Sequence, residues 1–489
     1  AHVTVRDVGE DLVDGRGNDI LATRDETGSA LLKLGFEPDY QRVELTLERF
    51  ENSGRNPVNA NDMATASNLV DRSTERANSR LRYQLAPPDN DWLDLSLVAY
   101  DNRVDAREFR LDDARIDRST FRTRGAELIN SMTLPGIDGE RIRFTAGLEL
   151  YEDTQSGTRN GSARLQFPDA AVAYRAAFLQ GEIPLPAGFS LIPGVRYDHF
   201  EYRADAAFDT RSDSAVTPRI ALGWQPRDST YFWVEYAEAF RAPSLGELFA
   251  DGVHFAVPLA PGQVVINEFV PTPELRAEHG EQWQAGARWR RDGLFSRDLS
   301  VTLEGSLWRS DVDDFVDQVV TFISGAPRFD PASQTLVFPG VTSNRNVDAR
   351  LHGAEITATL RHASWYMNMG ITLIDGERDT GDNLASVQPM RATLGGGIYL
   401  LGGALTLGAD LVLSADRRDV PDGALATAGY GKTDAYARYQ PTTGVLAPWE
   451  FHLAIDNLFD KNHRIHPNAI EQPGRSLRLA ISRDFNWLP

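Results

Sequence analysis

Cysteine is absent from the 489-residue chain, and the chain contains no apolar run of about eighteen residues. The first absence excludes disulfide bonds and a cysteine nucleophile, and the second excludes a transmembrane helix. The catalytic signatures G-x-S-x-G and H-E-x-x-H are also missing. The sequence therefore predicts a protein that is not an enzyme and has no catalytic cofactor.

Positive charge is scarce as well. The chain has 50 Lys and Arg residues against 70 Asp and Glu residues, which gives a formal net charge of −20 at pH 7. Nucleic acid is not expected as a partner, because phosphate binding requires a basic patch. The mean hydropathy of −0.36 is typical of a water-soluble protein. A membrane barrel whose strands alternate apolar and polar residues gives a similar average, so this value does not exclude one.

Apolar and polar residues alternate with a period of two along much of the chain. In residues 93–100, LDLSLVAY, the odd positions are apolar and the even positions are mostly polar. Successive side chains of a strand point to opposite faces, so this pattern predicts β-strands with one apolar and one polar face. The same alternation occurs in residues 43–48, 142–150, 301–307, 405–411 and 477–482.

Short and long connections alternate between these segments. This arrangement is typical of outer-membrane barrels, which have short periplasmic turns and long extracellular loops. The sequence therefore predicts an all-β fold, a large antiparallel transmembrane β-barrel. The expected short turns are residues 37–40, 87–91, 135–140, 227–229, 362–364 and 401–403, and the expected long connections include residues 9–27, 53–71, 157–169 and 311–342.

Aromatic residues gather beside the predicted short turns. Aromatic rings favour the membrane interface, because one part of the ring system prefers hydrocarbon and another prefers water. The pattern predicts one aromatic rim of a barrel, with ordinary core aromatics as the alternative. The rim residues are Trp92, Trp224, Trp365, Tyr399 and Trp449, together with Trp487 at the C-terminal end.

One connection, residues 244–279, differs from the others. It follows a strand that ends at Phe240, and Pro243 then removes a backbone donor from strand pairing. No second strand is predicted before His279, and connections of this length are usually functional or disordered. Near its middle lies His254, whose neutral imidazole among apolar neighbours would be a good ligand for iron in a flat apolar cofactor. A surface or packing role is the alternative for an isolated histidine.

Three stretches around this histidine resemble known motifs. Residues 240–243 (FRAP), His254 and residues 272–275 (TPEL) resemble the FRAP box, the intervening histidine and the NPNL box of TonB-dependent outer-membrane haem receptors. The second box departs from the usual Asn-Pro-Asn-Leu. Residues 456–461 (DNLFDK) and 473–475 (PGR) resemble the end of barrels in the same superfamily. The box residues are Phe240, Arg241, Ala242, Pro243, Thr272, Pro273, Glu274 and Leu275.

The resemblance implies a receptor of the bacterial outer membrane that captures haem, free or from a carrier protein, on an extracellular loop. Haem would be the transported ligand, and the TonB complex would supply energy. His254 would bind the haem iron, while Phe255 and Phe269 would pack against the porphyrin. Arg241 would pair with a propionate, with a purely structural arginine as the alternative. Other implied partners are the lipid bilayer and lipopolysaccharide.

About twenty strands are predicted, whereas plugged outer-membrane transporters have twenty-two. The first segment already reads as the middle of a barrel. The plug, the TonB-contacting segment and the first two strands are therefore expected to be missing, and a complete twenty-stranded barrel is the alternative. The predicted strands are residues 1–8, 28–36, 41–53, 72–86, 92–108, 118–134, 141–154, 170–184, 190–206, 214–226, 230–241, 280–291, 298–312, 344–362, 364–378, 387–400, 404–416, 428–440, 447–464 and 475–487.

Two other functions are compatible with the same scaffold. A receptor for a ferric siderophore or another bulky nutrient would have no purpose for His254, and a passive pore would lack a folded binding loop. His463 and His466, on the last long loop, match no standard metal-site spacing and are predicted to be surface residues, with a ligand or metal site as the alternative.

Overall fold

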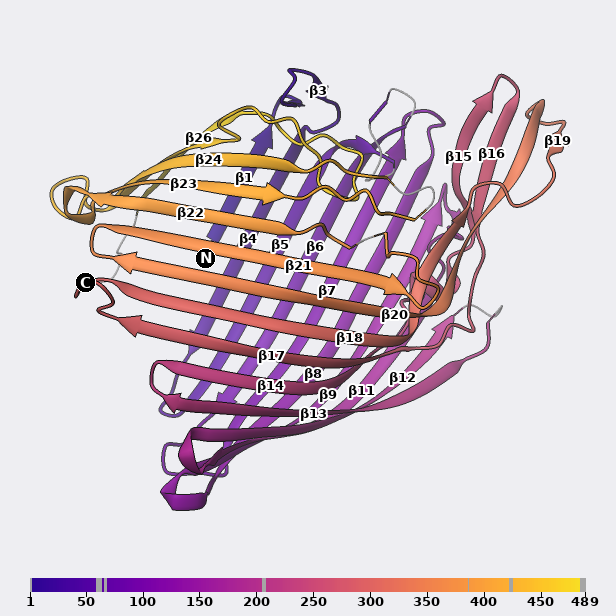
Figure 1. Ribbon diagram of the computed structural model, residues 1–489. Coiled ribbons are helices and arrows are strands. Elements are labelled where there is room, and N and C mark those ends of the chain that lie inside the picture. The colour runs from indigo at the N-terminus through magenta and orange to yellow at the C-terminus, as the bar shows by residue number, and fades with distance from the viewer. Residues whose placement is uncertain are drawn as a thin grey trace.

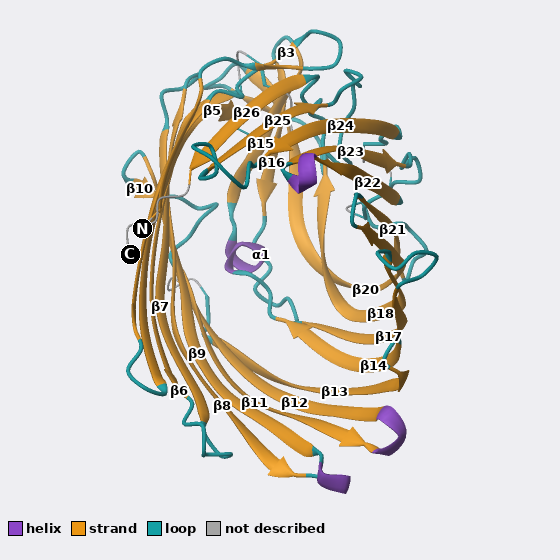
Figure 2. Cartoon of the chain, turned by 90° about the vertical axis from the view of Figure 1, so that its left-hand side faces the viewer, coloured by secondary structure: helices purple, strands orange, loops and turns teal. Residues whose placement is uncertain are grey.

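The protein is a large antiparallel β-barrel, seen here in a computed structural model that describes residues 2–58, 64–65, 68–204, 208–385, 387–421 and 425–483. One 24-stranded sheet curves around a lumen (Figure 1, Figure 2). Two short strands, β2 (Leu12–Val13) and β3 (Asp19–Ile20), form a separate hairpin. No helix in the described residues is long and apolar enough to cross a membrane.

Of the 26 strands in the described residues, six lie in connections and the other twenty build the wall. Besides β2 and β3, the connections hold β10 (Ser162–Ala163), β15 (Gly252–Ala260), β16 (Gln263–Phe269), β19 (Arg328–Asp330) and the helix α1 (Leu245–Phe249). The wall strands are β1 (His2–Val8), β4 (Asp25–Phe36), β5 (Gln41–Pro57), β6 (Leu69–Leu85), β7 (Asp94–Arg110), β8 (Ile116–Pro135), β9 (Arg141–Arg159), β11 (Ala170–Leu185), β12 (Phe189–Ala204), β13 (Arg211–Arg227), β14 (Thr230–Arg241), β17 (Glu278–Asp292), β18 (Ser300–Thr321), β20 (Thr335–His362), β21 (Trp365–Arg378), β22 (Arg391–Leu400), β23 (Leu405–Ser414), β24 (Tyr430–Tyr439), β25 (Trp449–Asp456) and β26 (Ser476–Arg483).

Each wall strand pairs antiparallel with the next wall strand along the chain. The β8–β9 ladder, for example, is unbroken from the pair Asp117 and Arg159 to the pair Pro135 and Arg141. The prediction of an all-β barrel with about twenty strands is therefore confirmed. Period-two alternation was sufficient for this, because it reports directly which residues share a face of a strand.

Short and long connections lie at opposite ends of the barrel, here named the short-turn end and the long-loop end (Figure 1). All six predicted short turns are present. Two of them contain a 3-10 turn, η1 (Ile137–Gly139) and η3 (Leu401–Gly403). A further short turn at the same end, which was not predicted, contains η2 (Pro186–Gly188) and joins β11 to β12. One connection at the long-loop end, residues 111–115 between β7 and β8, is also short.

Two predicted boundaries were wrong. Residues 311–342 are not one long connection, because β18 continues to Thr321 and pairs with β20 up to Val341, which carries the ladder beyond the barrel. Residues 457–464 are not strand, because the Asn457 side chain hydrogen-bonds the backbone of Lys461 and of Pro473 and so stabilises a turn.

The connection 244–279 was predicted without a strand, and this was also wrong. It holds α1 and the hairpin β15–β16, whose second strand pairs in parallel with β20 from Gln263 and Leu336 to Phe269 and Thr342. The partner of β16 lies about seventy residues away in the sequence, so local patterning did not reveal it.

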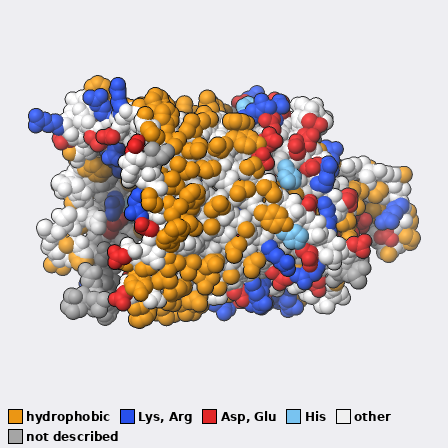
Figure 3. Space-filling view, turned by 90° about the horizontal axis from the view of Figure 1, so that it is seen from below, with side chains coloured by type: hydrophobic (Ala, Val, Ile, Leu, Met, Phe, Trp, Pro, Cys, Tyr) orange, Lys and Arg blue, Asp and Glu red, His pale blue; other side chains and the backbone are white. Residues whose placement is uncertain are grey.

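The outer surface carries a broad apolar belt (Figure 3). On β18, Leu303 and Leu307 are 44% and 66% exposed, and Ser306 between them faces the lumen side, opposite Glu355 of β20. At the rim, the indoles of Trp92 and Trp224 are exposed, and rings gather near the short turns, as predicted. Trp487 lies outside the described residues.

The register of the wall gives a test. Leu307→Arg places a guanidinium in the apolar belt and should destabilise the inserted barrel by about 2–4 kcal/mol. Ser306→Arg, one residue away, places the same group beside Glu355 in the polar interior and should assemble normally. Urea unfolding in liposomes and heat-modifiable gel migration measure both effects. Equal damage from the two substitutions would contradict the assignment of faces.

Candidate functional site

The two sequence boxes meet in one buried cluster at the long-loop end. Phe240 and Ala242 of the first box pack against a core that includes Leu275 of the second. The helix α1 lies within the ring of strands (Figure 2) and fixes this cluster to the inner wall formed by β11 and β12. The other core residues are Ala170, Val172, Phe200, Tyr202, Leu245, Leu248, Phe249, Ala277 and Val316.

Arg241 connects the ends of the connection that it opens. Its Nε and Nη2 donate to both carboxylate oxygens of Glu278, the Nε bond being 2.8 Å, and Nη1 donates to Glu247 Oε2 at 2.9 Å. Burial raises the pKa of Glu247, but the hydrogen bonds from Arg241 and from the Ser244 backbone outweigh it and lower the pKa below its usual range. The carboxylates of Glu247 and Glu278 therefore both bind the Arg241 guanidinium, which favours the structural alternative for Arg241.

The remaining box residues hold the backbone of the connection. Pro243 is fully buried, and its carbonyl accepts a hydrogen bond from the Tyr202 hydroxyl at 2.5 Å. Thr272 donates from its backbone N to Leu248 O and from Oγ1 to Glu247 O, both at 2.9 Å. The carbonyls of Pro273 and Leu275 accept from Arg211 Nη1 at 2.8 and 2.5 Å, whereas Glu274 is exposed. The boxes therefore shape the loop and present other residues to solvent.

His254 lies at a β-bulge near the base of the β15–β16 hairpin. Val253 pairs with Glu268 and Phe255 pairs with Asn267, so His254 is the extra residue on its strand. Bulges of this kind re-aim a side chain and are frequent beside functional sites. His254, the residue predicted to bind iron, is therefore held by a paired strand of a hairpin that projects from the long-loop end (Figure 1).

Aromatic rings surround the imidazole of His254. The ring of Phe269 lies 4.1 Å from it, centroid to centroid, and the ring of Phe255 lies 4.8 Å away. Phe255 in turn stacks on Phe322, with centroids 6.2 Å apart. Burial lowers the pKa of His254, and its interaction with Asn267 offsets this only in part, so the imidazole is neutral at pH 7. The structure thus brings together the three residues predicted to contact a ligand, His254, Phe255 and Phe269.

A buried polar chain lies behind the imidazole. Thr342 Oγ1 lies 3.0 Å from His254 Nδ1 and donates to Asn267 Oδ1 at 2.6 Å, and Asn267 Nδ2 donates to Thr321 O at 3.2 Å. Asn267 and Thr342 are 0% exposed. Gly340 gives the amide its space, because a Cβ there would lie 2.8 Å from Asn267 Nδ2.

Three of these residues were not predicted from the sequence: Asn267, Thr342 and Phe322. Thr342 lies 88 residues from His254 and reaches it only because β16 pairs in parallel with β20. Phe322 lies just beyond the end of β18, inside a stretch that was predicted to be a loop. The Val264–Ile266 run of β-branched residues was the one local signal for β16, and it does not name the partner strand.

The two histidines of the last loop are structural, and their prediction as surface residues was wrong. His466 is 2% exposed and bonds Thr427 Oγ1 through Nδ1 at 3.0 Å and Ala385 O through Nε2 at 2.9 Å. His463 is 8% exposed and packs on Tyr430. Among the described residues there is no group of three or more His, Cys, Asp or Glu side chains that could hold a metal ion.

Known proteins resemble the chain in sequence. The Heme/hemopexin utilization protein C of Haemophilus influenzae is 28% identical over 436 residues, which cover 86% of this chain and 59% of that protein. The Hemin receptor of Yersinia pestis is 26% identical over 479 residues, which cover 96% of this chain and 67% of that protein. The chain thus spans about three fifths to two thirds of the length of these relatives.

Solved structures resemble it in fold. The copper transporter OprC superposes with a TM-score of 0.76 at 18% identity, over 97% of this chain and 74% of that one. A double mutant of the Serratia marcescens hemophore receptor HasR, in complex with HasA and heme, gives a TM-score of 0.76 at 17% identity, over 99% of this chain and 75% of that one. The family model described as TonB dependent receptor-like, beta-barrel, matches residues 10–458. The chain therefore belongs to the family of TonB-dependent receptor β-barrels.

Proposed function

We propose that this barrel is the membrane part of an outer-membrane receptor that binds haem at its long-loop end and passes it into the periplasm. One observation carries the proposal: the hairpin presents a neutral imidazole whose Nδ1 is hydrogen-bonded, and whose Nε2 makes no hydrogen bond within the described part of the chain. The relatives named Hemin receptor and Heme/hemopexin utilization protein C support haem as the cargo.

The buried polar chain selects the nitrogen that is offered to iron. Asn267 donates through Nδ2 to Thr321 O, which turns its Oδ1 toward Thr342. The single hydroxyl proton of Thr342 is used in the bond to Asn267 Oδ1, so toward His254 this hydroxyl only accepts. Nδ1 of His254 therefore carries the proton, and the lone pair lies on Nε2. This tautomer binds iron through Nε2.

The aromatic side chains supply a surface for the porphyrin. Phe269 and Phe255 lie on either strand of the hairpin, and Phe322 extends the same surface from the end of β18. Phe322 is 43% exposed, so its ring is accessible to a ligand. Flat rings favour offset stacking on one another, so these residues suit a planar apolar cargo.

The remaining parts of the proposal follow from family membership. The apolar belt supports a position in the bacterial outer membrane, among lipid and lipopolysaccharide, and the length of the connections supports an orientation with the long-loop end outside the cell. Transport makes and breaks no bond in the cargo, so the protein acts as a receptor and transporter and not as an enzyme. Energy comes from the TonB complex, and the cargo is either free haem or haem delivered by a carrier protein.

Loss of the imidazole tests the proposal. His254→Ala in the receptor purified from membranes should weaken haem binding by about 100-fold or more and should change the axial-ligand absorbance spectrum. His352→Ala, on the outer face of β20, should change neither. Because the pKa of His254 is lowered from 6.5, affinity should be constant near neutral pH and fall only below pH 6.5 as the imidazole is protonated. Unchanged affinity and spectrum in His254→Ala would favour a siderophore or another nutrient as the cargo.

A second substitution tests whether Thr342 sets the tautomer of His254. Thr342→Val keeps the shape of the side chain but removes the acceptor for Nδ1–H, and it should weaken haem binding by about 10- to 100-fold. Thr342→Ser retains the hydroxyl and should restore most of the affinity. Thr427→Val is the matched control, because Thr427 makes the same 3.0 Å contact with Nδ1 of His466, away from the site. Full affinity in Thr342→Val would show that the polar chain does not set the tautomer.

A further inference from the structure

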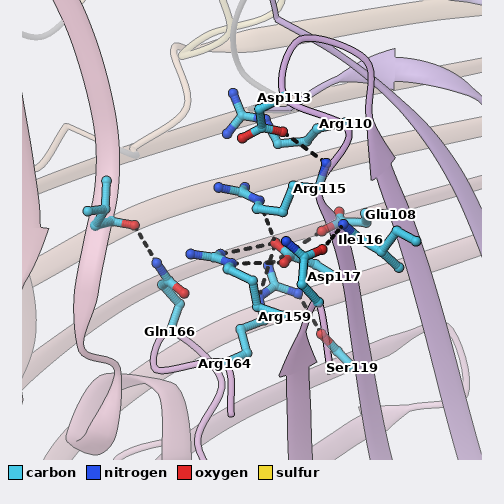
Figure 4. Close-up of polar contacts among 12 residues, drawn as sticks. Glu108, Arg110, Asp113, Arg115, Ile116, Asp117, Ser119, Arg159, Arg164 and Gln166 are labelled. Atoms are coloured by element: carbon cyan, nitrogen blue, oxygen red, sulfur yellow. Dashed lines mark hydrogen bonds and ion pairs between the residues drawn. The ribbon is translucent and has the colours of Figure 1, made fainter. Parts of the chain in front are cut away.

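A group of arginines surrounds one buried carboxylate on the wall beside the hairpin (Figure 4). Asp117 on β8 is 2% exposed. Arg159 donates to both of its oxygens, at 2.8 and 3.0 Å, while the Nε atoms of Arg115 and Arg164 lie 3.4 and 3.7 Å from it. These three arginines are here named the arginine patch. One carboxylate cannot satisfy three guanidinium groups, each of which has five donors.

The neighbouring acidic residues do not neutralise the positive charge of these arginines. Glu108 binds Arg72 at 2.8 Å and lies 3.4 Å from Arg164. The carboxylates of Glu108 and Asp117 are therefore shared by four guanidinium groups, those of Arg72 and the arginine patch. On the exposed connection above, Asp112 is bonded to Arg110, and Asp113 accepts from the backbone N of Arg115. Local positive charge in a chain of net charge −20 marks a site suited to an anion.

Unpaired buried atoms concentrate at the same place. Eight buried side-chain nitrogen and oxygen atoms of the described residues lack a hydrogen-bond partner, and three of them are Arg115 Nε, Arg164 Nε and Gln166 Oε1. Within the described part of the chain the Arg115 guanidinium makes no hydrogen bond, and burial lowers its pKa although it stays protonated. Buried donors without partners are costly, so a ligand that accepts hydrogen bonds would be favoured here.

The patch faces the lumen. Leu128 on β8 and Leu148 on β9 are exposed on the outer face. Asp117 and Arg159 each stand eleven residues from the outward leucine on their own strand, and both ladders are regular, so these two side chains point inward. They lie at the long-loop end of the barrel.

The patch also connects to the strand that carries His254. Two residues beyond Arg164, Gln166 Nε2 donates to Val253 O at 2.6 Å. The backbone N of Asp251 donates to Leu165 O at 3.1 Å, so the connection between β9 and β11 is fastened to the start of β15 at two points. The spacing between the patch and the imidazole is therefore set by direct bonds.

We propose that Arg115 and Arg164 form a subsite for the carboxylate groups of the cargo. When the cargo is haem, these groups are its two propionates, so the inference rests on the function proposed above and adds the group that the patch recognises. Arg159 keeps Asp117 in place and is a positioning residue. Arg241, for which the sequence predicted a propionate contact, is already bound by two carboxylates and does not belong to this subsite.

The test compares haem with haem dimethyl ester, in which both carboxylates are blocked. The wild-type receptor should bind haem on the order of ten-fold more tightly than the ester, because charge-assisted hydrogen bonds are lost in the ester. The double variant Arg115→Gln, Arg164→Gln should bind haem as weakly as the ester, should bind the ester like the wild type, and should keep the axial-ligand spectrum. Arg103→Gln, on the outer face beside Asp105, should retain the full preference.

Each result is decisive. A double variant that retains the preference for haem over the ester would overturn the subsite, as would a wild type that binds both equally. Because these outcomes leave the His254-dependent spectrum intact, they differ from failure of the proposed function, in which neither porphyrin binds. If the double variant fails to show heat-modifiable migration, the single variant Arg115→Gln replaces it. This variant removes the guanidinium without hydrogen bonds and should lose most of the preference.

Discussion

Backbone N–H and C=O groups that enter hydrocarbon have no water to bond, so they must pair with one another. The antiparallel ladder that runs from β1 to β26 meets this requirement for every wall strand between these two, and everything else in the protein depends on it. The ladder forces side chains to alternate between lipid and lumen, which produces the apolar belt outside and the ion pairs inside. It also leaves the two ends of the barrel as the places where backbone can depart from the ladder, and the residues of the proposed haem site lie at one of these ends.

The site is an extension of the wall. β18 and β20 continue past the barrel as a paired ladder, and β16 joins the free side of β20 in parallel. These three paired strands give Asn267 and Thr342 a fully buried position, where an unsatisfied polar group would cost about 1–3 kcal/mol. The same cost keeps the chain of hydrogen bonds intact, and in the proposed site this chain holds the imidazole of His254 in one tautomer. A solvent-exposed loop would leave both the ring and its proton free to change.

Sequence patterning predicted the wall well and the site in part. Alternation along β7 or β18 reports which side chains share a face, and the short turns follow from where that alternation stops. His254 and its aromatic neighbours were found through the boxes around them. Asn267 and Thr342 were missed because a parallel pairing across seventy residues leaves no local trace. For Arg241 the sequence left a propionate contact and a structural role as alternatives and did not name the partners, since the register that sets it opposite Glu278 is a property of the β14–β17 ladder.

Arginine illustrates how context decides the role of a residue type. Arg241 has two carboxylates within hydrogen-bonding distance and holds the connection closed, whereas Arg115 has a buried donor atom with no acceptor. The first arrangement is complete in itself, and the second gains from a further anion. Because Gln166 and Asp251 fix the connection that carries Arg164 to the strand that carries His254, the two recognition points move together. A cargo that meets both must be rigid, with an electron-pair acceptor at its centre and carboxylates at its edge. A planar iron porphyrin has this arrangement, whereas a flexible chelator would lose conformational entropy to reach both points.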